Sequence, residues 1–267
     1  MTGYRPAVPT AETRQLLSYR GRMSRRVALI ADTSFYVGPE IARLLASRNH
    51  DLVVAAPADG LVDDLTGHGV DVEVVEERVR LQDPEATRAL VERGLGRFGR
   101  IDAAIAFTGR VVTGPFLQAT ADDLDRAMRW CIVEPFNFLQ AVVPPMVERG
   151  EGQVLVFTSA AGSKPTPNAP LYSTARAAAN MMVRNVAAEV ASSSVQVNAI
   201  GTNFMDFPEF RRAAGADDPD VRARIEAAVP LRRLGTMAEC AAFSMPFVDG
   251  TSTFTTGQVV NYAGGWV

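Results

Sequence analysis

Short apolar segments alternate with longer helical segments along almost the whole chain, and this alternation constrains the fold more than any other feature. The apolar segments are residues 26–31, 51–56, 71–75, 101–107, 153–158, 195–200 and 258–261. Parallel strands need long crossover connections, and helices supply them by packing on both faces of the sheet. The sequence therefore predicts an α/β fold, a single-domain doubly wound parallel sheet of about seven strands.

The segments between the expected strands have the periodicity of helices. The expected helices are residues 39–47, 84–98, 121–146, 170–192, 218–228 and 236–247. We expect Pro135 to bend or interrupt the third of them, and Pro144 and Pro145 to end it, because proline lacks the N–H that a helix interior uses.

The composition excludes several classes of partner. With 267 residues, of which 47% are hydrophobic and 21% charged, the chain suits one soluble globular domain. A formal net charge of −3 provides no basic field for a phosphate backbone, so we expect no nucleic acid partner. No apolar run reaches the roughly 20 residues that cross a bilayer, so we expect no membrane partner and a cytoplasmic protein.

The first 25 residues differ in character from the rest. They mix Pro, Thr and Arg and lack the apolar core of a signal peptide. We expect residues 1–25 to be a flexible N-terminal extension and residues 26–267 to form the catalytic domain. The two cysteines are expected to be reduced core thiols. With two histidines, and carboxylates that show no ligand spacing, we expect no metal site.

A serine, a tyrosine and an arginine stand at fixed distances around the fifth expected strand. Ser159 follows that strand at its carboxyl end, where open α/β sheets bind ligands. Tyr172 and Arg176 are four residues apart in an expected helix and so share one face of it. A nearby guanidinium favours the ionised form of a phenol. The three residues could therefore act on one hydroxyl, with Tyr172 taking its proton and Ser159 holding its oxygen.

The loop after the first expected strand does not resemble a dinucleotide-binding loop. That fingerprint uses several glycines so that backbone amides can approach a pyrophosphate. Residues 32–38 hold one glycine, Gly38, and two aromatic residues, Phe35 and Tyr36. We therefore expect no nucleotide cofactor, and a small pocket lined by Tyr36 in the vacated space. The alternative is that both aromatic residues are plain packing residues of the loop.

The pattern Ser, twelve residues, Tyr, three residues, Lys is the catalytic pattern of the short-chain dehydrogenase/reductase superfamily, which the chain resembles from Arg25 to Val267. The resemblance implies a Rossmann-like fold of that type. Three departures stand out: Arg176 replaces the lysine that contacts the nicotinamide ribose, residues 106–109 replace an asparagine-rich motif, and residues 202–203 replace a Pro-Gly pair.

Ser-x12-Tyr-x3-Arg, together with an aromatic residue in the first loop, is similar to the halohydrin dehalogenases, a cofactor-independent branch of that superfamily. Tyr36 and Gly38 are in register with the first-loop motif of this branch, whereas Ala31 stands where it has threonine. Residues 198–210 and 229–237 are similar to the G-type subgroup, whose members accept cyclic epoxides.

This resemblance implies a carbon–halide lyase. Tyr172 as phenolate would deprotonate a vicinal haloalcohol, whose oxyanion closes an epoxide and expels halide. In reverse, azide, cyanide or nitrite would open the epoxide. The implied halide site comprises Tyr36, Thr202, Asn203, Phe204 and Met205, with the amides of Phe204 and Met205 as donors. Phe35 and Ala161 would shape the substrate pocket, and the long helices would assemble a homotetramer.

Two other functions remain open at this point. One is an NAD(P)-dependent short-chain oxidoreductase of the same fold. The other is a catalytically idle member of the superfamily that serves as a binding or scaffold subunit.

Overall fold

Seven parallel strands form one sheet at the centre of the molecule, in the order β3-β2-β1-β4-β5-β6-β7. The computed structural model describes residues 25–267, so nearly all of the expected N-terminal extension lies outside the described residues. The strands are β1 (Val27–Ile30), β2 (Asp51–Ala55), β3 (Val72–Val75), β4 (Ala103–Phe107), β5 (Gly152–Ser159), β6 (Val195–Thr202) and β7 (Val259–Tyr262). This order confirms the predicted doubly wound α/β sheet.

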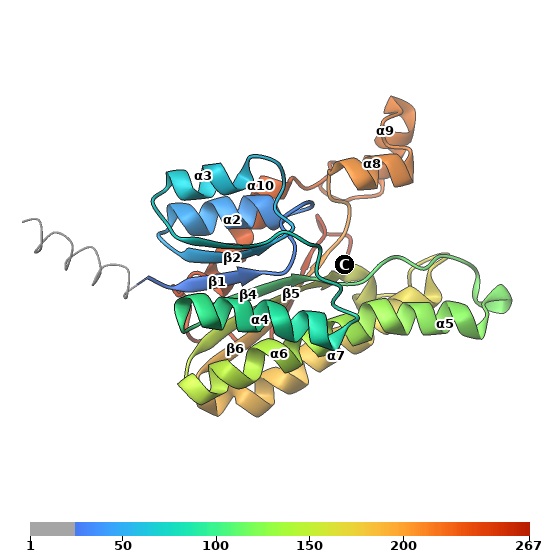
Figure 1. The fold of residues 1–267 in the computed structure, drawn as a ribbon. Coiled ribbons are helices and arrows are strands. Elements are labelled where there is room, and N and C mark those ends of the chain that lie inside the picture. Colours follow the sequence, from blue (N-terminus) through green and yellow to red (C-terminus); the bar gives the residue numbers. More distant parts are fainter. Residues whose placement is uncertain (1–24) are drawn as a thin grey trace, which may run out of the picture.

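Helices cover both faces of the sheet (Figure 1). One face carries α2 (Gly38–Ser47), α3 (Leu61–Gly67) and α10 (Met237–Ser244), and the other carries α4 (Pro84–Phe98), α6 (Glu134–Arg149) and α7 (Pro170–Val190). Short 3-10 turns complete the chain: η1 (Phe116–Gln118), η3 (Ala160–Ser163), η4 (Ala191–Ser193) and η5 (Met245–Phe247).

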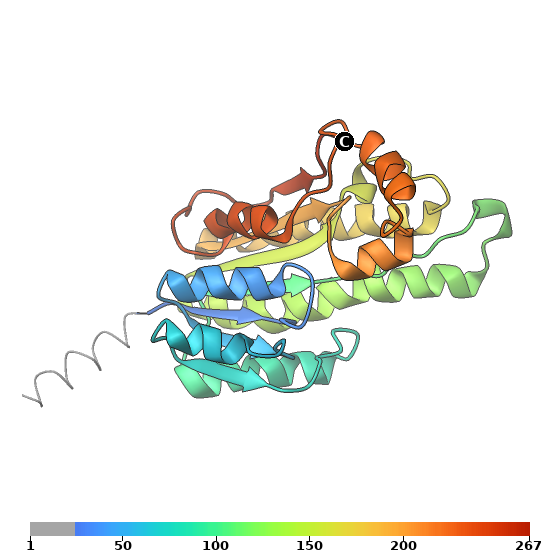
Figure 2. The same ribbon diagram turned by 90° about the horizontal axis from the view of Figure 1, so that it is seen from above.

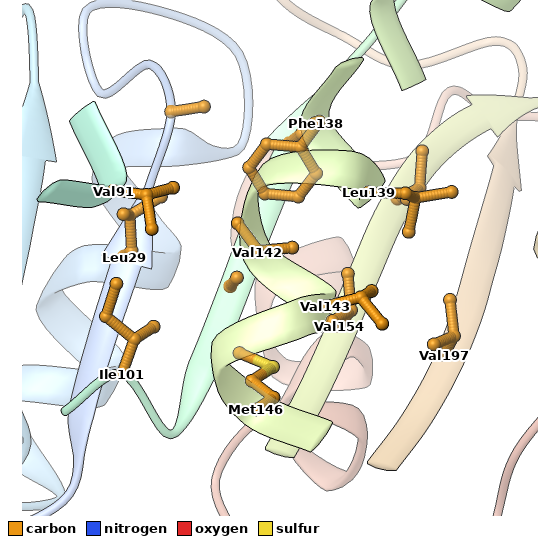
Figure 3. Close-up of a cluster of buried hydrophobic side chains, with 14 of the residues drawn as sticks. Leu29, Val91, Ile101, Phe138, Leu139, Val142, Val143, Met146, Val154 and Val197 are labelled. Atoms are coloured by element: carbon orange, nitrogen blue, oxygen red, sulfur yellow. The ribbon is translucent and has the colours of Figure 1, made fainter. Parts of the chain in front are cut away.

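Both faces of the central strands are buried, which explains why these strands read as continuous apolar runs. Leu29 of β1 packs in the core beneath α4 and α6, while its neighbour Ile30 packs in the core beneath α2. In the first of these cores, Phe138, Val142 and Met146 project from one side of α6 at helical spacing (Figure 3). Apolar packing against helices therefore stabilises the sheet on both of its faces.

The expected helix 121–146 is two helices joined by a wider turn. Helix α5 (Ala121–Met128) leads into a π-helical segment, η2 (Arg129–Val133), and then into α6. The π segment lies directly before Pro135, which has no N–H to donate to the carbonyl four residues earlier. The interruption expected near this proline is confirmed.

The expected end of this helix at Pro144 and Pro145 is wrong, because α6 continues through both prolines to Arg149. Pro144 is exposed, so the carbonyl that loses its partner can bond to water. Val142 and Met146 are buried against the sheet, and this packing keeps the last turns helical.

Two short helices, α8 (Pro208–Ala214) and α9 (Pro219–Ala227), are inserted between β6 and β7. They stand beyond the carboxyl end of the sheet, at the same end as α5 (Figures 1 and 2). Within residues 25–267, no helix is both long enough and apolar enough to cross a membrane. The insertion and α5 thus frame the end of the sheet where the predicted site residues lie.

Candidate active site

A cavity of about 1370 Å³ opens at the carboxyl end of the sheet. It brings together all ten site residues that the sequence singled out. They are Ser159, Tyr172 and Arg176, with Phe35, Tyr36, Ala161, Thr202, Asn203, Phe204 and Met205. The cavity also reaches residues 78–82 after β3, which the sequence did not connect with this site.

Ser159 is the last residue of β5 and is almost fully buried. Its Oγ accepts a hydrogen bond from the amide of Ala161 at 3.1 Å and donates one to the carbonyl of Thr202 at 3.3 Å. The first bond caps the η3 turn that follows the strand. The hydroxyl is therefore held at the strand end, beside the cavity.

Tyr172 and Arg176 lie one turn apart on α7, and both are buried. The guanidinium carbon of Arg176 is 5.1 Å from the centroid of the Tyr172 ring. Burial lowers the pKa of Arg176, but attraction to Tyr172, Cys131 and Glu134 outweighs this, so its pKa lies above the ordinary value. A permanent positive charge thus lies beside the Tyr172 ring.

Arg176 is held by the residue at the end of β4. Its Nη1 donates to the hydroxyl of Thr108 at 3.3 Å, and its Nη2 donates to the carbonyl of the same residue. The next residue, Gly109, has a φ of +81°, and a Cβ there would lie 2.4 Å from the guanidinium carbon. Glycine is required at this position because backbone and guanidinium are in direct contact.

Glu134 is a site residue that the sequence reasoning missed. It lines the cavity and is 9% exposed. Its Oε2 accepts from the amide of Gly109 at 2.7 Å, and its Oε1 accepts from the side-chain amide of Gln82 at 2.8 Å. The available signal was an acidic residue between the apolar runs at residues 130–133 and 135–136.

Tyr36 fills the centre of the first loop and has a φ of +56°. Its ring packs edge-on against Phe107, Phe157 and Phe207, with centroid distances of 4.9 to 6.1 Å. Its hydroxyl donates to the hydroxyl of Thr202 at 2.7 Å. Burial raises the pKa of Tyr36, so this phenol stays protonated. Tyr36 is therefore both a packing residue and a polar part of the cavity wall.

The same loop carries a negative charge at its start. The Asp32 carboxylate accepts from the amide and the hydroxyl of Ser34, at 2.9 and 2.6 Å. Its other oxygen lies 2.9 Å from Nε of Arg78, whose guanidinium stacks 5.0 Å from the Phe35 ring. Arg78 thus ties the first loop to the segment after β3.

The loop after β6 forms the opposite wall. The amide of Phe204 donates to Oδ1 of Asn203 at 2.9 Å, so this amide, expected to bind an anion, is already engaged by the neighbouring side chain. Phe204 has a φ of +55° and packs edge-on against Trp266 near the C-terminus. Met205 is buried beneath them.

The structure offers no obvious metal site. In the part of the chain from Arg25 to Val267, no group of three or more His, Cys, Asp or Glu side chains is placed to hold an ion. The two cysteines, Cys131 and Cys240, are free and buried, as the sequence predicted.

Comparison with known proteins adds a family relationship. A family model described as "Enoyl-(Acyl carrier protein) reductase" matches residues 36–267. Oxidoreductase UcpA of Escherichia coli O157:H7 is 29% identical over 245 residues, which cover 89% of this chain and 92% of that protein.

Solved structures similar to this chain include two at comparable identity. Acetoin dehydrogenase from Enterobacter cloacae is 26% identical, with a TM-score of 0.77 and coverage of 91% of this chain and 96% of that one. A protein described as a dehalogenation enzyme is 27% identical, with a TM-score of 0.78 and coverage of 92% and 99%.

These comparisons contradict the expectation of a carbon–halide lyase. The curated relatives are named as oxidoreductases and dehydrogenases, and the matching family model is a reductase model. The physical reason for the error is that a serine, a tyrosine and an arginine at this spacing are suited to proton transfer at a substrate oxygen in either class of enzyme. Their spacing does not determine what leaves the neighbouring carbon.

Proposed function

The chain belongs to the short-chain dehydrogenase/reductase family described as enoyl-(acyl carrier protein) reductase, and we propose that it is an oxidoreductase acting at a hydroxyl or carbonyl oxygen of a small organic molecule. One observation carries the proposal. The Tyr172 phenol lies beside the buried Arg176 guanidinium, and both line one cavity with Ser159. The relatives' names make oxidation or reduction the reaction class.

The chain's own groups supply the proton transfer. Tyr172 exchanges a proton with the substrate oxygen, and the charge of Arg176 stabilises the phenolate. Ser159 turns its hydroxyl proton from the Thr202 carbonyl to the substrate oxygen and fixes its position. The carbonyl and the hydroxyl of Thr108 accept hydrogen bonds from Arg176 and hold its guanidinium.

The family implies a nicotinamide dinucleotide, but the first loop does not fit the family's pyrophosphate site. The loop has one glycine, Gly38, and the Asp32 carboxylate and the Tyr36 ring take up space that a glycine-rich loop leaves open for phosphates. At the other end, Arg176 is bonded to Thr108 rather than free for a ribose hydroxyl. The chain thus has the groups proposed for proton transfer, Ser159, Tyr172 and Arg176, but within residues 25–267 it lacks the glycine-rich loop and the free cation that usually contact the nucleotide.

A turnover assay tests the proposal. Purified protein is given aldehydes and ketones with NADH or NADPH, or secondary alcohols with NAD⁺ or NADP⁺, and nicotinamide absorbance is followed. We expect turnover of at least one such substrate, with weak nucleotide binding because the first loop lacks the usual phosphate contacts. A parallel assay without nucleotide follows halide release from a 2-haloalcohol. Halide release without any nicotinamide-linked turnover would overturn the assignment to oxidation or reduction, and would leave the role of Tyr172 in proton transfer standing.

Restoring glycines in the first loop is expected to strengthen nucleotide binding. The double variant Asp32→Gly/Tyr36→Gly removes the carboxylate and the ring, and glycine at position 36 tolerates the φ of +56° found there. We expect the dissociation constant for NADPH to fall by at least about tenfold, which corresponds to about 1.4 kcal/mol. Titration of NADPH fluorescence measures it, and circular dichroism checks the fold.

A matched control for this variant is Asp59→Gly. Asp59 is an exposed acidic residue that does not line the cavity. Equal NADPH affinity in the wild type, the double variant and the control would show that Asp32 and Tyr36 do not obstruct the nucleotide.

We also propose a homotetramer. The helices α6 and α7 expose apolar side chains on the side away from the sheet, including Phe136 and Met181. Burying such residues between subunits is favourable. Sedimentation equilibrium measures the assembly, and a monomer at micromolar concentration would exclude it.

A further inference from the structure

A single peptide group lies between two buried charged side chains. The carbonyl of Thr108 accepts from Nη2 of Arg176, and the amide of Gly109 donates to Oε2 of Glu134 at 2.7 Å. This carbonyl and this amide belong to the same planar peptide unit. The positive charge is at its oxygen and the negative charge is at its hydrogen. Each hydrogen bond therefore polarises the peptide in the sense that strengthens the other.

Glu134 is built firmly into this position. The residue stands where the π segment η2 passes into α6, and its side chain is buried. Its second oxygen accepts from Gln82, so both carboxylate oxygens are hydrogen-bonded. Burying a carboxylate is costly unless such bonds are made. Here one bond is made to Gln82 and the other to the peptide that holds Arg176.

The guanidinium depends on that peptide for its position. Among the described residues, Nε of Arg176 is buried without a hydrogen-bond partner. Both Nη atoms bond to Thr108. The contact at Gly109 leaves no room for the guanidinium to move toward the backbone. A shift of the peptide between residues 108 and 109 would therefore move the charge relative to Tyr172.

We propose that Glu134 is a positioning residue, which fixes the Thr108–Gly109 peptide and through it the Arg176 guanidinium beside Tyr172, and whose charge moderates the pull of that guanidinium on the phenol. The proposal rests on the proton-transfer role proposed for Tyr172. It assigns Glu134 no contact with substrate.

Three other titratable groups lie near Tyr172 and Arg176, and each is either uncharged at neutral pH or exposed to solvent. The Cys131 thiol approaches from η2, and burial raises its pKa. The Tyr36 phenol approaches from the first loop, and burial raises its pKa as well. Arg110 follows Gly109 in the chain but is exposed, so solvent screens its charge. Glu134 is thus the carboxylate whose removal should be felt at Arg176.

Two substitutions separate the charge of Glu134 from its hydrogen bond. Glu134→Gln keeps an oxygen that accepts from Gly109, and Gln82 can turn its own amide oxygen toward the new NH₂ group. Glu134→Ala removes both the charge and the acceptor. Glu148→Gln, an exposed position on the same helix, is the matched control.

Two measurements are made as a function of pH. The first is the absorbance of tyrosinate, from which the absorbance of the Tyr172→Phe protein is subtracted so that the signal of Tyr172 remains. The second is kcat/KM. In Glu134→Gln we expect the tyrosinate midpoint to fall by up to about one pH unit, because Arg176 is no longer partly neutralised. In Glu134→Ala we expect kcat/KM to fall by about 100-fold, as for a group misplaced by an ångström. Glu148→Gln should match the wild type in both.

Three results would overturn the proposal. The first is the same tyrosinate midpoint in the wild type and in Glu134→Gln. The second is a wild-type kcat/KM in Glu134→Ala. The third is an equal loss of kcat/KM in Glu134→Gln and Glu134→Ala while the tyrosinate midpoint of both stays at the wild-type value. The absorbance titration needs no substrate. An inactive wild type would therefore refute the proposed function, while the midpoints would still decide the role of Glu134. Melting temperatures identify a variant that does not fold.

Discussion

Tyr172→Phe is expected to lower kcat/KM by about 1,000-fold, the middle of the range for removal of a general acid or base, while the protein stays folded. The substitution removes one oxygen and keeps the ring. That ring packs with Ala161, Ala169 and Ala175, so the apolar contacts survive. The measurement is the rate with the best substrate found, at the optimal pH of the wild type, alongside the melting temperature.

Tyr262→Phe is the matched control for this loss. Tyr262 ends β7 and packs against Phe243, and it does not line the cavity. We expect it to leave the rate unchanged. A Tyr172→Phe protein that retains more than a tenth of the wild-type rate would show that the phenol is not the proton-transfer group.

The strands could be predicted from the sequence to within about two residues at their ends. Residues 153–158 were expected and Gly152–Ser159 are observed, because a run of apolar residues without helical periodicity marks a buried parallel strand. The helix ends were less predictable. Pro144 and Pro145 are local stop signals, yet α6 passes through them because its buried face packs on the sheet. Local rules fail where tertiary packing opposes them.

The site was predictable where its geometry is local. Tyr172 and Arg176 share a helix face, and Ser159 ends a strand, so spacing alone places all three at one end of the sheet. Glu134 was missed because its partner, Gly109, belongs to a different element and is 25 residues away. No sequence pattern connects the two.

The reaction class was not predictable from the same residues. A phenol, a hydroxyl and a guanidinium move a proton on a substrate oxygen whichever group leaves the next carbon. The aromatic first loop suggested that no hydride is transferred, whereas the curated relatives are named as oxidoreductases. The residues suit proton transfer, and the names of the relatives support oxidation or reduction as the reaction class.

Gly109→Ala is expected to impair stability and catalysis together, although the residue has no side chain of its own. At a φ of +81° an L-residue costs roughly 1–2 kcal/mol, and the new methyl would lie 2.4 Å from Cζ of Arg176. The guanidinium is planar and buried and must shift. We expect unfolding free energy to fall by about 2–4 kcal/mol and kcat/KM by about 100-fold.

Gly96→Ala provides the contrast, because that glycine lies in α4 and a methyl group added to it would have no neighbouring atom within 4 Å. We expect it to raise the unfolding free energy by up to about 1 kcal/mol and to leave the rate unchanged. Urea denaturation and steady-state kinetics measure both variants. Wild-type stability and rate in Gly109→Ala would mean that Arg176 is free to move away from the Thr108–Gly109 peptide. The positioning of Arg176 by that peptide, and with it the role of Glu134, would then fail, because the guanidinium would not depend on that contact.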